Sequence, residues 1–440
     1  MPSVPSDPSR PPSLWRDRDF RSLWAGQTAS QFGAQAGQVT LPLLAVVALH
    51  ADATQLGALR AAQQVPILLF SLFVGVWVDR WRSRDVMVRA DFGRAVALAA
   101  IPVAFLLGVL GMPLLLVLAF LVGVLTVFFD VAYQAALVRL VKRDQLAQGN
   151  SALEGSRSAA QIGGPALGGA LVSLLSAPIA VVAGAFFFTV SFLSIRRIRH
   201  REPLSPDVAR PATTESATVR PARMRRQILE GLRFVVGDPS LRAVGLASAI
   251  FQFSFAALMT VYLLFLPRTL HLSGAEVGLV LAAMGPGALV GSVLSAGMPK
   301  RFGYGVVLVF SAALADGVML LVPALHGSTA RTIACLMAVN FLFGVFSQLV
   351  DVTVMAVRQS ITPPAIQGRT VATINFVGMG LTPLGSLLGG FLAATWDPRT
   401  SLLVAAIGLL LSPVFMALSP LARLGKELPT PGDPGGPCAR

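Results

Sequence analysis

The sequence predicts an all-α membrane protein in which twelve transmembrane helices form two pseudo-symmetric six-helix bundles. Three observations support this fold class: a composition poor in charge, twelve long apolar runs, and a repeat that relates the two halves. Of the 440 residues, 54% are hydrophobic and 13% are charged. A soluble domain carries about 25% charged residues. Lipid is therefore the expected solvent for much of this chain.

Each apolar run is long enough for one crossing, because a helix needs about 20 mostly apolar residues to span the hydrocarbon. The first six runs cover residues 22–48, 54–78, 86–110, 112–137, 147–175 and 178–195. The last six cover residues 241–266, 274–298, 306–323, 331–357, 369–394 and 400–420. The runs divide the chain into a disordered N-terminus (1–20), a first bundle (21–195), a linker (196–240), a second bundle (241–420) and a disordered tail (421–440).

The formal net charge of +14 comes from Lys and Arg residues clustered between the apolar runs. The clusters fall on the side of the two termini, as in the segment from Arg80 to Arg89. The opposite loops keep only Arg268, Arg331 and Arg399. Because cytoplasmic loops carry the excess of Lys and Arg, we expect an inner-membrane (plasma-membrane) protein with both termini in the cytoplasm. The same distribution argues against binding of nucleic acid through a basic surface.

A constant offset of 221 residues aligns the first half of the chain with the second. At this offset Asp130 falls on Asp351, and Arg80 falls on Arg301. Apolar residues match often by chance, so the paired intramembrane carboxylate and the paired loop arginine are more informative. Parallel six-helix repeats occur in transporters that bind substrate between the halves, near the middle of the membrane. The repeat therefore predicts a transporter rather than a static structural protein.

The cytoplasmic end of the second run carries Gly75, Asp79, Arg80 and Arg84. This segment resembles the loop signature of the major facilitator superfamily, Gly-x-x-x-Asp-Arg followed by further basic residues. The resemblance implies a charge cluster that latches the cytoplasmic side, although Arg82 stands where the signature has a glycine. The alternative is ordinary basic charge on the inner side of the membrane.

Two pairs of opposite charges follow helical spacing: Asp91 with Arg94, and Glu154 with Arg157. Ionisable residues are costly in hydrocarbon, and pairs at this spacing can neutralise each other. All four residues lie within about two turns of the cytoplasmic helix ends. We therefore expect Asp91, Arg94 and Arg157 to belong to a structural inner gate, with proton carriage by these pairs as the alternative.

The fifth run contains Gly164, Pro165, Gly168 and Gly169. These residues resemble the Gly-Pro-x-x-Gly-Gly core of the superfamily's antiporter motif. Small residues permit close helix packing, and a proline kinks a helix or frees a carbonyl. In the superfamily this motif marks exporters, so the resemblance implies a hinge that serves export. A plain packing seam of small residues is the alternative.

Asp130 lies inside its run with no basic residue three or four positions away, and its repeat mate Asp351 is also unpaired locally. A buried carboxyl group without a partner can take up a proton. We therefore predict Asp130 and Asp351 as proton-coupling residues, with Glu154 as a third candidate. The alternative is that each accepts a hydrogen bond from an arginine of another helix, such as Arg94 or Arg157.

A substrate cavity is predicted from one polar and one aromatic helix face. A row of amides would be expensive in lipid, so we expect the row to face a wet central cavity. Amides on one wall and aromatic rings on the other suit a bulky amphiphilic solute, with helix packing as the alternative for the aromatic face. The candidate residues are Gln27, Gln31, Gln35 and Gln38 in the first run and Phe251, Phe255 and Tyr262 in the seventh.

Segments 20–27 and 129–134 resemble the enterobactin-exporter and macrolide-efflux branch of the major facilitator superfamily. The resemblance implies proton-coupled export of a drug, siderophore or amphiphilic secondary metabolite by alternating access. We expect a monomer that binds a small-molecule substrate within the lipid bilayer, without a cofactor and driven by the proton gradient. The alternatives are a proton-coupled importer of a small polar nutrient and a membrane sensor that binds without transport.

Other functional classes lack their characteristic residues. The sequence has no Gly-x-x-x-x-Gly-Lys-Ser/Thr phosphate loop, which argues against an ATP-driven pump. The four histidines are scattered over loops and helix ends, and Cys335 and Cys438 suit no metal site. We therefore predict neither an enzyme nor a metal centre.

Overall fold

The computed structural model describes residues 14–141, 145–199, 235–362 and 378–427, together with Arg233, Thr373, Ile374 and Phe376. Within these residues the regular structure is helical throughout. The side chains of residues 71–72, 75–80, 138 and 147 are outside this description. Most of the predicted N-terminal segment (1–20), linker (196–240) and tail (421–440) also lies outside it.

The first half consists of six long helices in chain order. They are α1 (Arg18–Leu43), extended by the π-helical turn η2 (Leu44–Ala48), α2 (Ala53–Arg80), α3 (Ser83–Leu106), α4 (Met112–Leu140), α5 (Leu146–Leu175) and α6 (Ala177–Arg196). The short helix η1 (Leu14–Arg16) precedes them.

The second half repeats this order, although several of its helices are interrupted. Its long helical segments, here called rods, are α9 (Pro239–Arg268), α10 with α11 (Gly274–Ala282 and Met284–Ser295), α13 with η4 (Tyr304–Val318 and Met319–Ala324), α14 (Ala330–Ile361), α16 (Thr382–Thr395), and α17 with α18 (Pro398–Leu409 and Leu411–Leu418). Two short helices, α12 (Met298–Phe302) and η6 (Pro420–Arg423), complete it.

The described residues therefore form six rods in each half, which fits the predicted arrangement of twelve helices in two bundles. Eight of these segments are long and apolar enough to span a membrane by length and composition alone. The other four rods are α1, α2, α3 and α16. The first three carry polar or charged residues inside the helix, such as Gln31, Arg60 and Asp91, and the described part of α16 is short. Polar helices of this kind are tolerated where they face protein or water rather than lipid.

The 221-residue offset predicted from the sequence recurs in the positions where helices begin. Four helices of the first half start at Arg18, Ala53, Ser83 and Ala177, and their counterparts start 221 residues later at Pro239, Gly274, Tyr304 and Pro398. Even the helix caps agree. Asp17 accepts hydrogen bonds from the backbone N–H groups of the second and third residues that follow it, and Asp238 does the same at α9. A carboxylate is a preferred cap because it satisfies these free donors.

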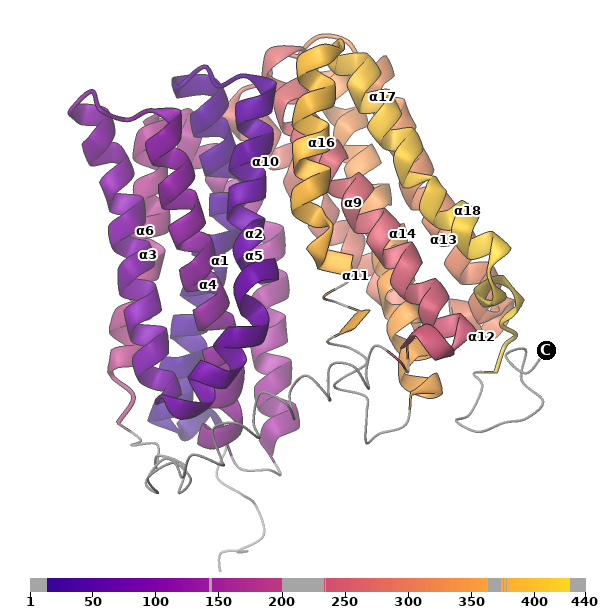
Figure 1. Cartoon of the computed structure of the whole chain (residues 1–440), viewed down its shortest axis with the longest axis horizontal. Helices are drawn as coiled ribbons and strands as arrows, with labels where there is room; N and C mark the ends of the chain where they lie inside the picture. The colour runs from indigo at the N-terminus through magenta and orange to yellow at the C-terminus, as the bar shows by residue number, and fades with distance from the viewer. Residues whose placement is uncertain are drawn as a thin grey trace, which may run out of the picture.

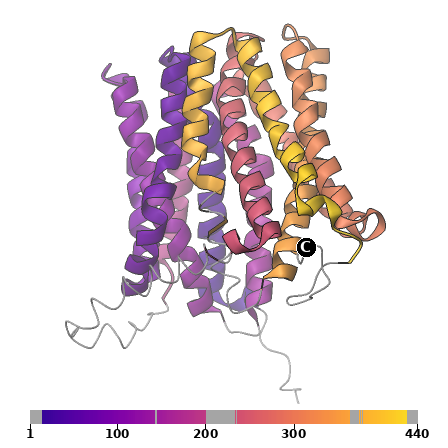
Figure 2. The same ribbon diagram turned by 45° about the vertical axis from the view of Figure 1, so that its right-hand side comes forward.

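The two bundles lie side by side and approach each other most closely at one end (Figures 1 and 2). One hydrophobic cluster at that end contains residues of both halves, for example Leu43, Leu56, Leu266 and Val277. We call this the closed end. At the opposite end each half has its own cluster, around Phe20 and Met87 in the first half and around Leu308 and Val357 in the second. We call this the open end, and the described chain begins and ends there.

Candidate substrate cavity and its closed end

A cavity of about 530 Å³ lies between the two bundles. Helices α1, α2 and α5 of the first half line it together with α9, α10, α11 and α14 of the second. Its amide and charged lining residues are Gln35, Gln38, Arg60, Gln161, Gln348 and Asp351. A cavity that is shared by both halves and combines polar with apolar walls is suited to a small amphiphilic solute.

Only the second part of the predicted amide row reaches this cavity. Gln35 and Gln38 line it, whereas Gln27 is 2% exposed and its Oε1 has no hydrogen-bond partner in the part of the chain that the structure describes. Gln31 is half-buried and lies outside the lining formed by the described residues. The start of α1 is packed tightly against α6, because a Cβ at Gly26 would lie 2.6 Å from Cγ1 of Ile195. The expectation of one continuous amide wall is therefore corrected to Gln35 and Gln38.

The predicted aromatic face divides between three environments. Phe255 lines the central cavity, and Phe251 lines a second pocket inside the second half. The two rings stack with centroids 5.4 Å apart. Tyr262 is fully buried, and its hydroxyl accepts a hydrogen bond of 2.8 Å from Nδ2 of Asn340. Tyr262 therefore ties α9 to α14 and does not face the cavity, which corrects its assignment as a substrate contact.

Two glycine pairs bring the halves into backbone contact near the closed end. A Cβ added to Gly169 of α5 would lie 2.5 Å from the Cα of Gly278 of α10. A Cβ added to Gly57 of α2 would lie 2.9 Å from the Cα of Gly390 of α16. Gly390 follows Gly169 by 221 residues, and Gly278 follows Gly57 by the same number. The internal repeat therefore relates the two contacts to each other. Because only glycine permits such close helix approach, the repeat preserves the fit of the two halves.

The predicted antiporter motif supplies one of these glycines and packs α5 against two helices. A Cβ on Gly164 would lie 2.4 Å from Cβ of Gln35, and a Cβ on Gly168 would lie 2.8 Å from the carbonyl oxygen of Ala36. Pro165 lines the central cavity between these contacts. The motif thus holds α5 close to α1 on one side and close to α10 on the other. Its action as a hinge stays a prediction.

Two polar contacts reinforce the closed end. The guanidinium of Arg268, at the end of α9, donates a hydrogen bond to the carbonyl of Ala51 in the first half. The backbone N–H of Ala275 donates to Oγ of Ser173 at 2.5 Å. Both bonds join one half to the other, so the closed end combines apolar, glycine and hydrogen-bond contacts.

Comparison with known proteins places this architecture in a family. A family model described as transmembrane secretion effector matches residues 11–431. The chain belongs to this family of major facilitator superfamily transporters. It is therefore a multi-pass membrane transporter.

Curated relatives of this transporter include efflux pumps. The multidrug efflux pump Tap of Mycolicibacterium fortuitum is 27% identical over 376 residues, covering 82% of this chain and 86% of that protein. The uncharacterized MFS-type transporter y4rN of Sinorhizobium fredii is 27% identical over 375 residues, covering 84% and 87%.

Solved structures share the fold. A bacterial homologue of the human lysosomal transporter Spinster, in an inward-facing and occupied conformation, has a TM-score of 0.73 at 13% identity, covering 94% of this chain and 98% of that one. A bacterial homologue of the iron transporter ferroportin, in an inward-facing state, has a TM-score of 0.72 at 16% identity, covering 92% and 99%. At these identities the likeness concerns the fold alone.

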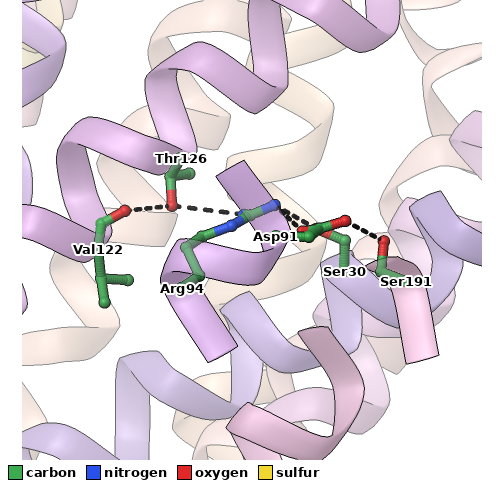
Figure 3. A network of polar contacts seen from close by, with 6 residues as sticks. All are labelled: Ser30, Asp91, Arg94, Val122, Thr126 and Ser191. Atoms are coloured by element: carbon green, nitrogen blue, oxygen red, sulfur yellow. Dashed lines mark hydrogen bonds and ion pairs between the residues drawn. The ribbon is translucent and has the colours of Figure 1, made fainter. Parts of the chain in front are cut away.

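The transporter's first half contains a buried ion pair between Asp91 and Arg94 of α3 (Figure 3). Arg94 also donates to Oγ of Ser30 on α1 at 3.1 Å, and Oγ of Ser191 on α6 donates to Asp91 at 2.5 Å. Thr126 of α4 lies 3.5 Å from the guanidinium, which is flanked by two phenylalanine rings at 4.3 Å. The pair thus joins four helices of one half. In this conformation it pins the first bundle together and does not latch the two halves to each other, which corrects its assignment to a gate.

Of the other predicted gate residues, the structure describes the side chains of Arg84 and Arg157. The side chains of Gly75, Asp79 and Arg80 lie outside the described residues. Arg84 donates a hydrogen bond of 2.6 Å to the carbonyl of Arg196, at the end of α6. Glu154 and Arg157 are 3.9 Å apart, with side chains 69% and 50% exposed. An exposed pair of this kind contributes little stability, so Glu154 and Arg157 do not form a stabilising buried ion pair.

The repeat mates Asp130 and Asp351 lie in unlike surroundings. Asp130 on α4 is half-buried, within electrostatic range of Arg94 and Arg157, and forms no hydrogen bond among the described residues. Asp351 on α14 is exposed and lines both the central cavity and the pocket of the second half. Asp351 can therefore meet solute directly, whereas Asp130 is not among the described residues that line these two cavities. Their predicted role in proton coupling stays a prediction.

Two further ionisable residues face these cavities although no motif marks them. Arg60 of α2 is 9% exposed and lines the central cavity, and its Nε has no hydrogen-bond partner within the described ranges. Asp316 of α13 is 1% exposed and lines the pocket of the second half. The sequence signal that could have found them is a charge inside an apolar run with no opposite charge one turn away. That signal also marks Asp130, but only the structure shows which charges meet a cavity.

Proposed function

We propose that this transporter exports an amphiphilic drug-like compound or secondary metabolite from the cytoplasm in exchange for protons. The observation that carries the proposal is the cavity of about 530 Å³ shared by both halves and sealed by glycine contacts at one end. A site that is closed on one side and lies between two repeats is what alternating access requires. The efflux function of the relative Tap supports export as the direction.

The proposal places the open end in the cytoplasm and the closed end outside the plasma membrane. Arg84, Arg139 and Arg358 lie near the open end, and positive charge is enriched on cytoplasmic loops. The inward-facing state of the two structural relatives supports the same orientation. Both termini are then cytoplasmic.

Proton coupling would use carboxyl groups that meet the cavity or the charges around it. Asp351 meets the cavity directly, and Asp130 lies beside Arg94 and Arg157. Glu154 is a weaker candidate, because it is largely exposed. Protonation of Asp351 would remove one negative charge from the cavity wall, so proton and cationic or polar solute would compete there.

The proposal is tested by expressing the chain in an efflux-deficient bacterium and measuring growth inhibition over a panel of drugs and metabolites. We expect resistance to rise for at least one amphiphilic compound, and cells loaded with that compound to lose it faster than cells carrying the empty vector. A proton uncoupler should abolish the faster loss. Faster accumulation of the compound in the expressing cells would instead show an importer, and contradict the proposal.

A further inference from the structure

A second cavity, of about 290 Å³, lies inside the second half between α9, α13, α14 and α18. Its lining contains two carboxylates and one guanidinium, those of Asp316, Asp351 and Arg358. Phe251 and Met355 contribute apolar wall. We call this cavity the C-terminal pocket.

Asp316 is the unusual residue of the C-terminal pocket. It follows the first residue of α13 by twelve positions, about 18 Å along the helix at 1.5 Å per residue. Its side chain is 1% exposed, and neither carboxylate oxygen has a hydrogen-bond partner among the described residues. A carboxyl group held in apolar surroundings without a partner takes up a proton, because its charged form is strongly destabilised there. A group of opposite charge entering the pocket would remove that penalty.

Arg358 does not supply this charge in the described structure. It lines the same pocket, but no ion pair joins it to Asp316 or Asp351 among the described residues, and its Nε has no partner. When both carboxyl groups are ionised, two carboxylates and one guanidinium give the lining one negative charge in excess. The electrostatics of the pocket therefore favour a ligand with a single positive charge.

The apolar lining favours an organic cation over a metal ion. The face of Phe251 can attract an ammonium group, and methionines such as Met355 and Met416 adapt to ligands of different shape. Among the described residues no group of three or more His, Cys, Asp or Glu side chains could hold a metal ion. An aromatic or aliphatic ammonium of modest size satisfies both the charge and the lining.

The C-terminal pocket adjoins the central cavity. Ser347 and Asp351 line both cavities. Phe251, which lines the C-terminal pocket, stacks on Phe255, which lines the central cavity. A cationic group could thus reach Asp316 past Asp351 while the remainder of the solute stays in the central cavity.

We propose that the C-terminal pocket is a subsite for the ammonium group of a monocationic amphiphile, and that Asp316 is the residue that selects for its charge. This inference rests on the proposed function, because it names the class of compound that the transporter would carry. It predicts a preference for cations over neutral compounds of similar size. The pocket that gives this preference is lined by residues of the second half only, among the described residues.

The test measures binding by isothermal titration calorimetry on the purified full-length chain in detergent. The probes are benzyltrimethylammonium, a compact aromatic cation, and N-benzylacetamide, a neutral compound of similar size. We expect Asp316→Asn to weaken benzyltrimethylammonium binding about tenfold or more, since a contact to a charged group is lost. Asp316→Glu, which keeps the charge, should bind close to wild type. Binding of N-benzylacetamide should not change in either variant.

Asp397→Asn is the matched control. Asp397 is exposed and caps α17 at the closed end, and asparagine is an equally good cap. This variant loses the same charge far from the pocket and should bind benzyltrimethylammonium as wild type does. Equal affinity of wild type and Asp316→Asn would overturn the inference, as would equal losses in Asp316→Asn and Asp316→Glu. If the purified protein binds the cation in a charge-dependent way but the cells show no efflux, the proposed function is refuted and the inference about the subsite is not.

Discussion

Gly169 of α5 lies against Gly278 of α10 so closely that neither residue has room for a Cβ. Their repeat mates, Gly390 and Gly57, form the equivalent contact between α16 and α2. The two contacts join the halves near the end where the central cavity is closed. They are therefore the points at which the described conformation is most sensitive to side-chain size.

Replacing Gly169 with alanine should destabilise the closed end. Overpacking costs about 1–3 kcal/mol, which shifts a two-state equilibrium about 5- to 150-fold. The shift should favour the conformation that opens at the present closed end. It is measured by labelling a single cysteine introduced at Ser292, which lines the central cavity. A thiol reagent that enters from the cytoplasmic side should react with this cysteine more slowly in Gly169→Ala than in the parent protein.

The matched control is Gly155→Ala on the same helix. A Cβ at Gly155 would meet no atom within 4 Å, so its labelling rate should equal that of the parent. Slowing in both variants would point to a general effect on α5 and contradict the role of the glycine contact. Because Cys335 is exposed, the parent carries Cys335→Ser and Cys438→Ser.

A disulfide across the closed end should arrest transport. Ala275 N lies 2.5 Å from Oγ of Ser173, so cysteines at these two positions come from backbone segments already in contact. In the background without native cysteines, oxidation of Ser173→Cys with Ala275→Cys should stop efflux, and reduction should restore it. Either single variant should be insensitive to oxidant. Undiminished efflux from the fully cross-linked protein would show that the closed end need not open.

The buried ion pair of α3 should matter for folding rather than for gating. Arg94→Met leaves Asp91 buried without its partner, and breaking a buried pair costs about 3–5 kcal/mol. Adding Asp91→Asn should recover part of this loss, since the orphaned charge is then removed. Thermal unfolding in detergent, followed by circular dichroism, measures both. Arg157→Met, which breaks the exposed pair with Glu154, should cost between 0 and about 1 kcal/mol. Similar losses for Arg94→Met and Arg157→Met would contradict the assignment.

Much of the fold could be predicted because it follows from properties that each residue carries alone. Apolar runs marked the helices, and one intramembrane pair, Asp130 with Asp351, revealed an offset that the helix starts then reproduced. The small residues of the antiporter motif indicated close packing on α5. The partner, however, was not visible: Gly278 belongs to a helix more than a hundred residues away, and only the packed halves bring it to Gly169.

The candidate site was harder to predict, because helical spacing gives a face but not the direction in which the face points. The glutamines of α1 share one face, yet Gly26 packs the start of that helix on α6, so only Gln35 and Gln38 meet the cavity. Tyr262 follows the spacing of Phe255 but lies deep enough to meet Asn340. Asp91 and Arg94 were expected at a gate because they are near a helix end. Their partners, Ser30 and Ser191, lie in the same half.

Proton movement through carboxyl groups at the cavity is the proposed driving force of export. The most direct measurement is accumulation of an identified substrate by proteoliposomes under an imposed pH gradient. Wild-type protein should accumulate substrate and lose it when nigericin collapses the gradient. Asp351→Asn should lose gradient-driven accumulation while still exchanging substrate down its own gradient. Accumulation that is equal in wild type, Asp351→Asn and Asp130→Asn, and indifferent to nigericin, would contradict the claim.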